Sequence, residues 1–437
     1  MNPLQTIETV KTLLSDSLFK NRHRSKLKAF SRNRKLRFPL VILLVLQKSM
    51  KSLQLVLNEF FSKLPGTRVV VSASAFTQAR RSLSYTAFIE LNQKAIVEPS
   101  YAEKNYRCWN GFRLLGIDGS KIRLPDTAAI REHFGTISMA NQREETTGEY
   151  PAALASVCYD VLNHIALDSC LAKARAYEVD LAIQHLAATQ DRDLLLMDRN
   201  YPSYLMLATL SQHRRDFVIR CSKASFREAR CMLKGQGTSS QIVTLRPHHT
   251  KLTEIQAAHL PLQITVRFVR VILETGEPEV LVTSLLEESA YPTEDFKELY
   301  HWRWGVETFY GLLKGRLSLE AFSGKTTEAV LQDFHAALFI SGLEAVLTHD
   351  AQQTLDLKTP RNRYPQQVNK AVSFNALKNH VLELFYSESD SQLLLQRLTQ
   401  LFLTAPLPIR EGRKFPRIFK CDRALIGYHK RRKKLCF

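Results

Sequence analysis

The sequence predicts a mixed α/β fold that lies between helical, basic ends and is interrupted by a β-rich insertion. Both ends of the chain read as helices rich in Lys and Arg. Between them, apolar strands alternate with helices, which is typical of an α/β sheet. One stretch breaks this alternation with β-rich segments that are separated by Gly, Pro and Ser. The predicted regions are therefore 1–105, 106–222, 223–290, 291–350 and 351–437.

Composition indicates a globular protein with an anionic partner. The chain has 437 residues, of which 45% are hydrophobic, so it can bury a core and hold several domains. Lys and Arg total 61 against 42 for Asp and Glu, a formal net charge of +19. This excess indicates a polyanion, most simply nucleic acid. A soluble basic protein without such a partner is the alternative.

Cysteine usage and hydropathy favour a reducing, cytoplasmic setting. The seven cysteines are odd in number and form no C-x-x-C pair, which argues against a disulfide framework and against structural zinc. No basic start followed by an apolar run indicates a signal peptide. The longest apolar run, "FPLVILLVL" at 38–46, is shorter than the roughly 20 residues of a membrane span, so we expect a core helix.

The first region predicts a compact helical head that binds DNA. Nine of the eighteen residues from Lys20 to Arg37 are Lys or Arg. The apolar helix follows this run, and "SLQLVLNEFFSKL" (52–64) continues as a second helix. "SASAFTQARRSLS" (72–84) opens with capping residues and continues as a basic helix. Clustered cations suit DNA phosphates, although a charge run can also be only a solvated face.

The second region predicts strands first and then alternating helices and strands. "FRLLGIDGSKIRL" (112–124) reads as a strand, a tight Asp-Gly turn and a returning strand. A β-hairpin follows at 153–173 and turns at Leu162–His164. The remaining elements are a helix at about 178–189, the buried strand "DLLLMD" at 193–198, a helix with Tyr204 and Leu207, and the strand "FVIRC" at 217–221.

The later regions complete the pattern. The insertion contains the β-rich segments "QIVTLRP", "LQITVRFVRVIL" and "PEVLVTSLL". We expect a helix at 298–316, an apolar helix at about 327–349 and a linker at 359–367. The tail is basic, with eleven Lys or Arg between Arg410 and Lys434.

The stretch "ELYHWRWGVETFYGLLKGR" (298–316) reads as one helix with a polar stripe. At 100° per residue, four side chains fall within an arc of about 60°: Tyr300, Arg303, Glu307 and Lys314. The opposite side predicts a buried face, formed by Leu299, Trp302, Val306, Phe309 and Leu313. The alternative for the stripe is a solvated face on which Arg303 and Glu307 form an i, i+4 pair.

Three carboxylates predict a metal site. Asp118 ends the apolar strand "LLGID" and Asp198 ends "LLLMD", where sites form at the rim of a sheet. Each Asp can also be a turn residue, and Asp198 can cap the next helix. If the two strands are neighbours, Asp118 and Asp198 meet and Glu307 completes the cluster. Such anions repel strongly unless cations lie among them, and oxygen ligands favour Mg²⁺ or Mn²⁺.

This arrangement predicts phosphoryl transfer with two metal ions. Two ions about 4 Å apart activate the attacking oxygen and stabilise the leaving oxygen. Asp118, Asp198 and Glu307 are then the catalytic metal ligands. Arg303 and Lys314 neutralise phosphates, and Tyr300 donates a hydrogen bond to a phosphate oxygen. No Gly-rich phosphate loop is present in the sequence, so nucleotide hydrolysis is not supported.

In this order, the two aspartates and the signature Y-x2-R-x3-E-x6-K resemble the DDE transposases of bacterial insertion sequences. The similarity is greatest to the branch that this signature defines. "GIDGSKIRLPD" around Asp118 and "MDRNYPSYLML" around Asp198 are also similar to the motifs of that branch. The resemblance covers about residues 106–350.

The resemblance implies a ribonuclease-H-like catalytic domain that an insertion of β-strands interrupts before the third acidic residue. It further implies Mg²⁺-dependent cutting of DNA at the inverted repeats of the element, joining of the freed 3′-hydroxyls to target DNA, and a homodimer as the active form. Some members hold a flipped base on a tryptophan of the insertion. This insertion has none, since the chain's tryptophans are Trp109, Trp302 and Trp304. Trp304 can stack on a base or pack in the core.

Two other functions remain open at this point. One is a nuclease with the same chemistry but no strand transfer. The other is a non-catalytic DNA-binding protein that acts through its basic ends alone.

Overall fold

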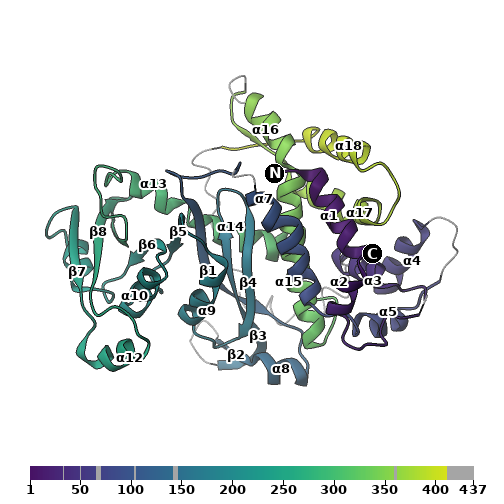
Figure 1. Ribbon diagram of the computed structural model, residues 1–437, viewed down its shortest axis with the longest axis horizontal. Coiled ribbons are helices and arrows are strands. Elements are labelled where there is room, and N and C mark those ends of the chain that lie inside the picture. Colours follow the sequence, from purple (N-terminus) through teal and green to yellow (C-terminus); the bar gives the residue numbers. More distant parts are fainter. Residues whose placement is uncertain are drawn as a thin grey trace. The chain divides into compact units, whose positions relative to one another are not determined.

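The computed structural model describes residues 1–410 apart from 33, 50, 65–69, 103–104, 141–145 and 359–361. The chain forms two compact units, each assembled from separate stretches of sequence (Figure 1). Unit 1 consists of residues 1–105, 123–152 and the chain from 312 onward. Unit 2 consists of residues 106–122 and 153–311. The predicted basic tail lies almost wholly outside the described residues.

The N-terminal part of unit 1 is helical, as predicted. The apolar run forms a helix in which every residue except Pro39 is buried. Ser72 caps its helix, since its hydroxyl accepts a hydrogen bond from the backbone N–H of Ala75 at 3.2 Å. The elements are α1 (Pro3–Ser15), α2 (Ser17–His23), α3 (Phe38–Leu46), α4 (Leu53–Ser62), α5 (Ala73–Arg80), α6 (Thr86–Leu91), a π-helical turn (Asn92–Val97) and α7 (Glu98–Ala102).

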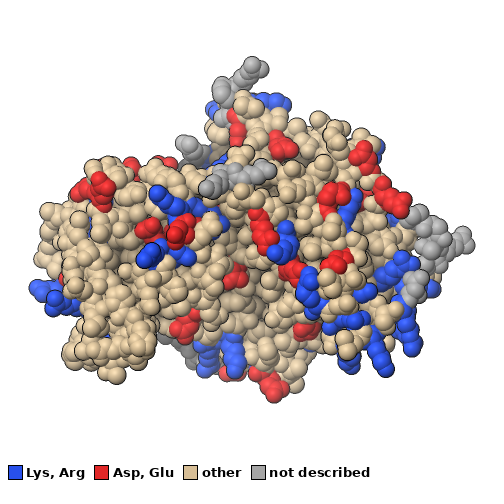
Figure 2. Space-filling model, in the orientation of Figure 1, with Lys and Arg blue, Asp and Glu red and all other residues tan. Residues whose placement is uncertain are grey.

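The basic run from Lys20 to Arg37 is largely exposed. Seven of its cations are exposed to solvent: Arg22, Lys26, Lys28, Arg32, Arg34, Lys35 and Arg37. Figure 2 shows Lys and Arg side chains gathered over the part of unit 1 that carries α2, α3 and α5. Unit 1 therefore presents a cationic surface at its N-terminal helices.

The C-terminal part of unit 1 is built around the long helix α15 (Thr327–Leu347). This helix is long and apolar enough to cross a membrane, yet it is buried in the core almost throughout. Its buried acids have cationic partners, because Asp333 pairs with Arg80 and Glu344 pairs with Lys370. The remaining elements are α16 (His349–Lys358), α17 (Lys370–Phe385), α18 (Ser391–Leu403) and a short ribbon of β10 (Gln366–Gln367) and β11 (Leu407–Pro408).

A nine-stranded mixed sheet has the order β2-β3-β1-β5-β6-β9-β8-β7, and β4 pairs with β3. Its strands are β1 (Arg113–Arg123), β2 (Thr136–Ala140), β3 (Thr146–Asp160), β4 (Ile165–Lys173), β5 (Asp193–Met197), β6 (Asp216–Cys221), β7 (Ser240–Leu245), β8 (Ile264–Ile272) and β9 (Pro278–Thr283). The helices between them are α8 (Ala128–Phe134), α9 (Glu178–Gln184), α10 (Tyr204–Gln212), α11 (Arg227–Leu233) and α12 (Leu252–Ala257).

The strand order confirms the ribonuclease-H-like fold. β3 and β4 form the predicted antiparallel hairpin. β1 is antiparallel to β3, since the N–H of Val161 donates to the oxygen of Leu114 and the N–H of Leu124 donates to that of Pro151. β5 is parallel to β1, and β6 is parallel to β5. The order β4-β3-β1-β5-β6 is therefore the sheet that the resemblance implies.

The insertion supplies β7, β8 and β9, which are β-rich as predicted. These strands do not form a separate sheet, because β9 pairs antiparallel with β6 and continues the same sheet.

The predicted Asp-Gly turn in "FRLLGIDGSKIRL" is wrong. β1 runs without interruption through Asp118 and Gly119, and Gly119 does not have the positive φ that a two-residue hairpin turn requires. The glycine instead permits close packing, since a Cβ at this position would lie 3.0 Å from the Cδ of Glu178. Asp118 therefore lies within a strand and not at its end.

The predicted helix at 298–316 is two helices, α13 (Asp295–His301) and α14 (Trp304–Gly315). The break lies where N–H groups bond three residues back, Arg303 to Tyr300 at 3.1 Å and Gly305 to Trp302 at 2.9 Å. This tighter turn rotates the second helix relative to the first. Trp302 is consequently 40% exposed, and its predicted burial is wrong. The four other residues of the predicted apolar face are buried.

Two glycines let α14 lie close to the sheet. A Cβ at Gly116 of β1 would lie 3.2 Å from the Cβ of Val306, and a Cβ at Gly305 would lie 3.0 Å from the Cβ of Val161. Both valines are fully or almost fully buried. Since their branched side chains have little freedom to move away, the glycines set the distance between helix and strand.

Gly305→Ala is expected to destabilise the protein, whereas Gly311→Ala on the same helix is not. The first change crowds Val161 and should cost about 1–3 kcal/mol. The second places a methyl group where no atom lies within 4 Å, and alanine's helix propensity favours it by up to about 1 kcal/mol. The free energy of unfolding from urea denaturation measures both. Equal stability of the two variants would contradict the close packing of α14.

Candidate active site

Asp118 and Asp198 lie at the same level of two neighbouring parallel strands. The register of β1 with β5 pairs Gly116 with Leu196. Two residues further along each chain are Asp118 and Asp198, so the register itself brings the aspartates side by side. This meets the condition that the sequence left open, namely that the two strands be neighbours.

Glu307 approaches the same place from the first turn of α14. It directly follows Val306, which packs against Gly116 two residues before Asp118. The proximity is also electrostatic, because the charges of both Asp198 and Glu307 raise the pKa of Asp118. Unit 2 therefore places the three predicted carboxylates, from two strands and a helix, within electrostatic reach of Asp118.

Burial and repulsion shift Asp118 towards its neutral form. Burial raises the pKa of Asp118 to about 7, and the charge of Asp198 adds to this. The backbone N–H of Gly119 and the Arg303 guanidinium act in the opposite direction. A carboxyl group with this pKa lies among anions that lack sufficient positive charge, so a cation bound here would relieve the repulsion.

Arg303 is the basic side chain at this cluster. It is 4% exposed, and its Nη2 donates to Glu307 Oε1 at 2.8 Å. Its guanidinium lies 4.8 Å from the ring centre of Trp304. Its Nε has no hydrogen-bond partner within the described part of the chain. The i, i+4 pair that we gave as the alternative for the stripe is therefore present, but it is partly buried beside the aspartates.

The donor set fits a hard divalent cation. Carboxylate oxygens are the ligands that Mg²⁺ and Mn²⁺ prefer. Among the described residues, no three acidic, His or Cys side chains converge as closely as a shared ion requires. The Glu307 carboxylate instead accepts a hydrogen bond from Arg303.

Asp198 also makes the turn that we gave as its alternative. Its Oδ1 accepts the backbone N–H of Asn200 at 2.8 Å. It does not cap α10, because that cap is the hydroxyl of Ser203. The turn orients the Asp198 carboxylate immediately beyond β5, and so the turn and a metal-binding role are compatible.

Tyr300 and Lys314, the other two residues of the predicted polar stripe, do not lie on an exposed polar face. Tyr300 is 4% exposed, and its hydroxyl donates to the backbone oxygen of Met197 at 3.3 Å. It therefore ties α13 to the end of β5, and it does not offer this hydroxyl to a phosphate. Lys314 is partly buried in unit 1, where burial lowers its pKa and Glu320 opposes this effect.

Sequence reasoning missed Tyr310, which holds α14 in place. Its hydroxyl lies 3.0 Å from the backbone oxygens of Asp118 and of Ala155. A tyrosine on an apolar helix face gives no signal of this role. Trp304 is 44% exposed, so its predicted packing in the core is wrong.

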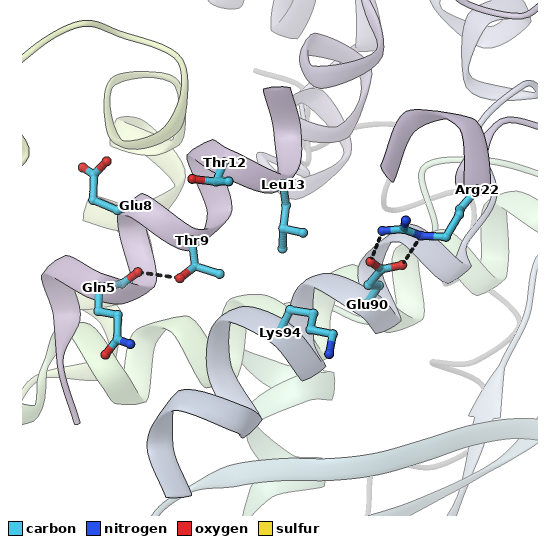
Figure 3. A pocket seen from close by; sticks show the side chains of 8 residues that line it. All are labelled: Gln5, Glu8, Thr9, Thr12, Leu13, Arg22, Glu90 and Lys94. Carbon is cyan, nitrogen blue, oxygen red and sulfur yellow. Dashed lines mark hydrogen bonds and ion pairs between the residues drawn. The ribbon is translucent and has the colours of Figure 1, made fainter. Parts of the chain in front are cut away.

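Two other features do not provide a competing site. Ser156, His185 and Asp168 form a hydrogen-bonded series with distances of 2.9 and 2.7 Å. The Ser156 side chain is buried and cannot meet a substrate. A pocket of about 470 Å³ in unit 1 is bordered by the Arg22–Glu90 ion pair (Figure 3). Its lining contains none of the predicted site residues.

Comparisons with known proteins identify the family of the chain. Residues 109–343, more than half of the chain, match the family described as "Transposase DDE domain". The chain is 26% identical over 387 residues to transposase InsG for insertion sequence element IS4 of Escherichia coli (strain K12), covering 84% of this chain and 80% of that protein. It is 30% identical over 144 residues to the putative transposase InsZ of the same organism, covering 33% and 47%. A solved structure of the piggyBac transposase synaptic complex with hairpin DNA is similar with a TM-score of 0.43 and 11% identity, covering 95% of this chain and 87% of that chain.

Asp118→Asn is expected to stabilise the cation-free protein above neutral pH. Because the pKa of Asp118 is raised to about 7, the wild type loses stability as the pH rises from about 4 through 7, with an upper limit of about 4 kcal/mol. The neutral amide avoids this loss. Melting temperatures in EDTA at pH 5 and pH 8 measure the difference, which should be larger at pH 8. A difference that does not depend on pH would contradict the repulsion at Asp118.

Proposed function

The chain belongs to the family of transposases with a DDE domain, and we propose that it acts at the ends of its own mobile element. It binds the terminal inverted repeats, cuts the DNA there and joins the freed 3′ ends to target DNA. The observation that carries this proposal is that, within the matched region, Asp118 and Asp198 follow the paired residues of two neighbouring strands and Glu307 is near enough to raise the pKa of Asp118. The signature Y-x2-R-x3-E-x6-K from Tyr300 to Lys314 supports membership of the branch that bears it.

DDE transposases use divalent metal, and in this chain we assign two Mg²⁺ ions, which Mn²⁺ can replace, to Asp118, Asp198 and Glu307. When bound, such ions activate the attacking oxygen and stabilise the leaving oxygen during in-line displacement at phosphorus. The two aspartates are held by the register of β1 and β5. Glu307 is the adjustable ligand, because it leaves Arg303 to join them.

Arg303 then becomes available to DNA. Once Glu307 turns to the cations, the guanidinium can donate hydrogen bonds to a phosphate oxygen, and its buried setting strengthens that contact. The exposed ring of Trp304 lies beside this guanidinium. It offers a face on which a base next to the cut can stack. Tyr300 supports the site by tying α13 to β5, and Lys314 contributes a phosphate contact further along α14.

The basic N-terminal helices supply much of the affinity for DNA. Their exposed cations form a continuous segment of the sequence, and they suit contacts with phosphates that do not depend on base identity. The basic tail adds further charge. Two copies of the chain, each holding one end of the element, form the active complex. The reaction takes place on bacterial DNA, which makes the protein cytoplasmic and associated with the nucleoid.

One observation and one experiment distinguish this function from the alternatives. A non-catalytic DNA-binding protein has no need for a carboxyl group whose pKa is raised to about 7 beside two other acids. A nuclease without strand transfer would produce nicked or cut ends that are never joined to a target. Incubation with linear DNA that carries the element's ends and with target plasmid, with and without Mg²⁺, separates these products on a denaturing gel.

Glu307→Ala is expected to reduce cleavage of a transposon-end duplex by at least about 100-fold, because the change removes a metal ligand. Binding of that duplex should stay nearly unchanged, because the basic surface is intact. Cleavage is measured on a denaturing gel and binding by mobility shift. Glu298→Ala, at an exposed position of the preceding helix α13, is the matched control and should cleave normally. Normal cleavage by Glu307→Ala would overturn the assignment.

Binding of transposon-end DNA is expected to weaken steeply with salt. Replacing Lys26, Lys28 and Arg32 together by Ala should reduce the slope of log K against log salt concentration by about 2–3, since each phosphate contact accounts for about 0.9. Fluorescence anisotropy from 50 to 300 mM KCl measures the slope. An unchanged slope would show that these cations do not contact DNA.

A further inference from the structure

A fourth carboxylate, that of Glu178, lies beside the predicted metal ligands. Glu178 is in the first turn of α9 and is half-buried. A Cβ at Gly119 would lie 3.0 Å from both the Cδ and the Oε1 of Glu178. Because residue 119 has no side chain, the Glu178 carboxylate can pack against the strand at Gly119, the residue that follows Asp118.

Glu178 is also electrostatically part of the cluster. Burial raises its pKa, the charge of Asp198 raises it further, and Lys121 of β1 lowers it. A lysine at an exposed position is a weak counterion for a half-buried carboxylate. Asp198 therefore acts electrostatically on both Asp118 and Glu178.

An unpartnered hydroxyl lies within electrostatic reach of the same three acids. Tyr201 is fully buried, and its Oη has no hydrogen-bond partner in the part of the chain that the structure describes. Burial raises the pKa of Tyr201, and the charges of Asp118, Glu178 and Asp198 all add to this. A buried hydroxyl without a partner costs about 1–3 kcal/mol. Together with the unpartnered Nε of Arg303, it indicates a polar ligand at this cluster.

We propose that Glu178 is a fourth acidic residue of the cation site and binds a divalent cation together with Asp118 and Asp198. The inference rests on the proposed function, since it assumes that these aspartates hold the ion. Two aspartates and one distant glutamate leave most positions of an octahedral ion to water. Glu178 supplies a further anionic oxygen from α9, whereas Glu307 comes from α14. A water bound to the ion would give the Tyr201 hydroxyl its hydrogen-bond partner.

The test is Mn²⁺ binding by the full chain without DNA, measured by the loss of free Mn²⁺ signal in electron paramagnetic resonance. Glu178→Gln keeps the shape and removes the charge, and we expect about 10-fold weaker binding. Asp180→Asn is the matched control, because it removes the same charge from an exposed position of the same helix. Its affinity should equal that of the wild type. Glu178→Asp, which keeps a carboxylate, should recover part of the loss.

The outcomes separate this inference from the proposed function. If Asp118→Asn loses Mn²⁺ affinity while Glu178→Gln keeps it, the inference is wrong and the proposed site stands. If neither variant loses affinity, the proposed metal site itself is wrong. Equal losses in Glu178→Gln and Asp180→Asn would reveal a general charge effect and would also overturn the inference. Melting temperatures in EDTA show that each variant is folded. Mn²⁺ should raise the melting temperature of Glu178→Gln by less than that of the wild type, and that of Asp180→Asn by the same amount as the wild type.

Discussion

The close contact of α14 with β1 is the constraint on which the candidate site depends. Val306 occupies the space beside Gly116, and Val161 occupies the space beside Gly305. Any larger residue at either glycine would move the helix away from the sheet. Because Glu307 follows Val306, the same contact decides whether the third acid reaches the aspartates. The hydroxyl of Tyr310 adds a second fixed point through the backbone oxygen of Asp118.

The packing of the fold holds the acidic side chains of the site near one another although their negative charges repel. The acids repel one another, as the raised pKa of Asp118 shows, and the single guanidinium of Arg303 offsets only part of that repulsion. The free energy that keeps them together comes from the buried strands β1 and β5 and from the packing of α14. Stability is thus sacrificed locally for function, a common feature of active sites. A cation converts the repulsion into binding energy, so metal affinity and local instability have the same origin.

Much of the fold could be predicted because apolar period and strand length are local properties of the sequence. The buried strand at 193–197, the hairpin at 153–173 and the helix α3 follow directly from them. The register of β1 and β5 turned two weak signals, Asp118 and Asp198, into a pair. What failed depended on contacts between distant segments. The Asp-Gly pair is a common turn signal, but here its glycine makes room for Glu178, which lies far along the chain. Neither the break before α14 nor the role of Tyr310 has a local signal.

The charge of the chain and the charge of its site have opposite signs, and this opposition links metal to DNA. The formal net charge of +19 attracts DNA phosphates, and exposed cations are concentrated in the N-terminal helices of unit 1. The acids of unit 2 would repel a scissile phosphate at the point where it must approach most closely. Divalent cations remove this barrier, since they are attracted by the acids and by the phosphate alike. In the proposed mechanism they also draw Glu307 from Arg303, which leaves the guanidinium for the DNA backbone. Metal and DNA therefore favour the same rearrangement of one ion pair, and each is expected to strengthen the binding of the other at this site.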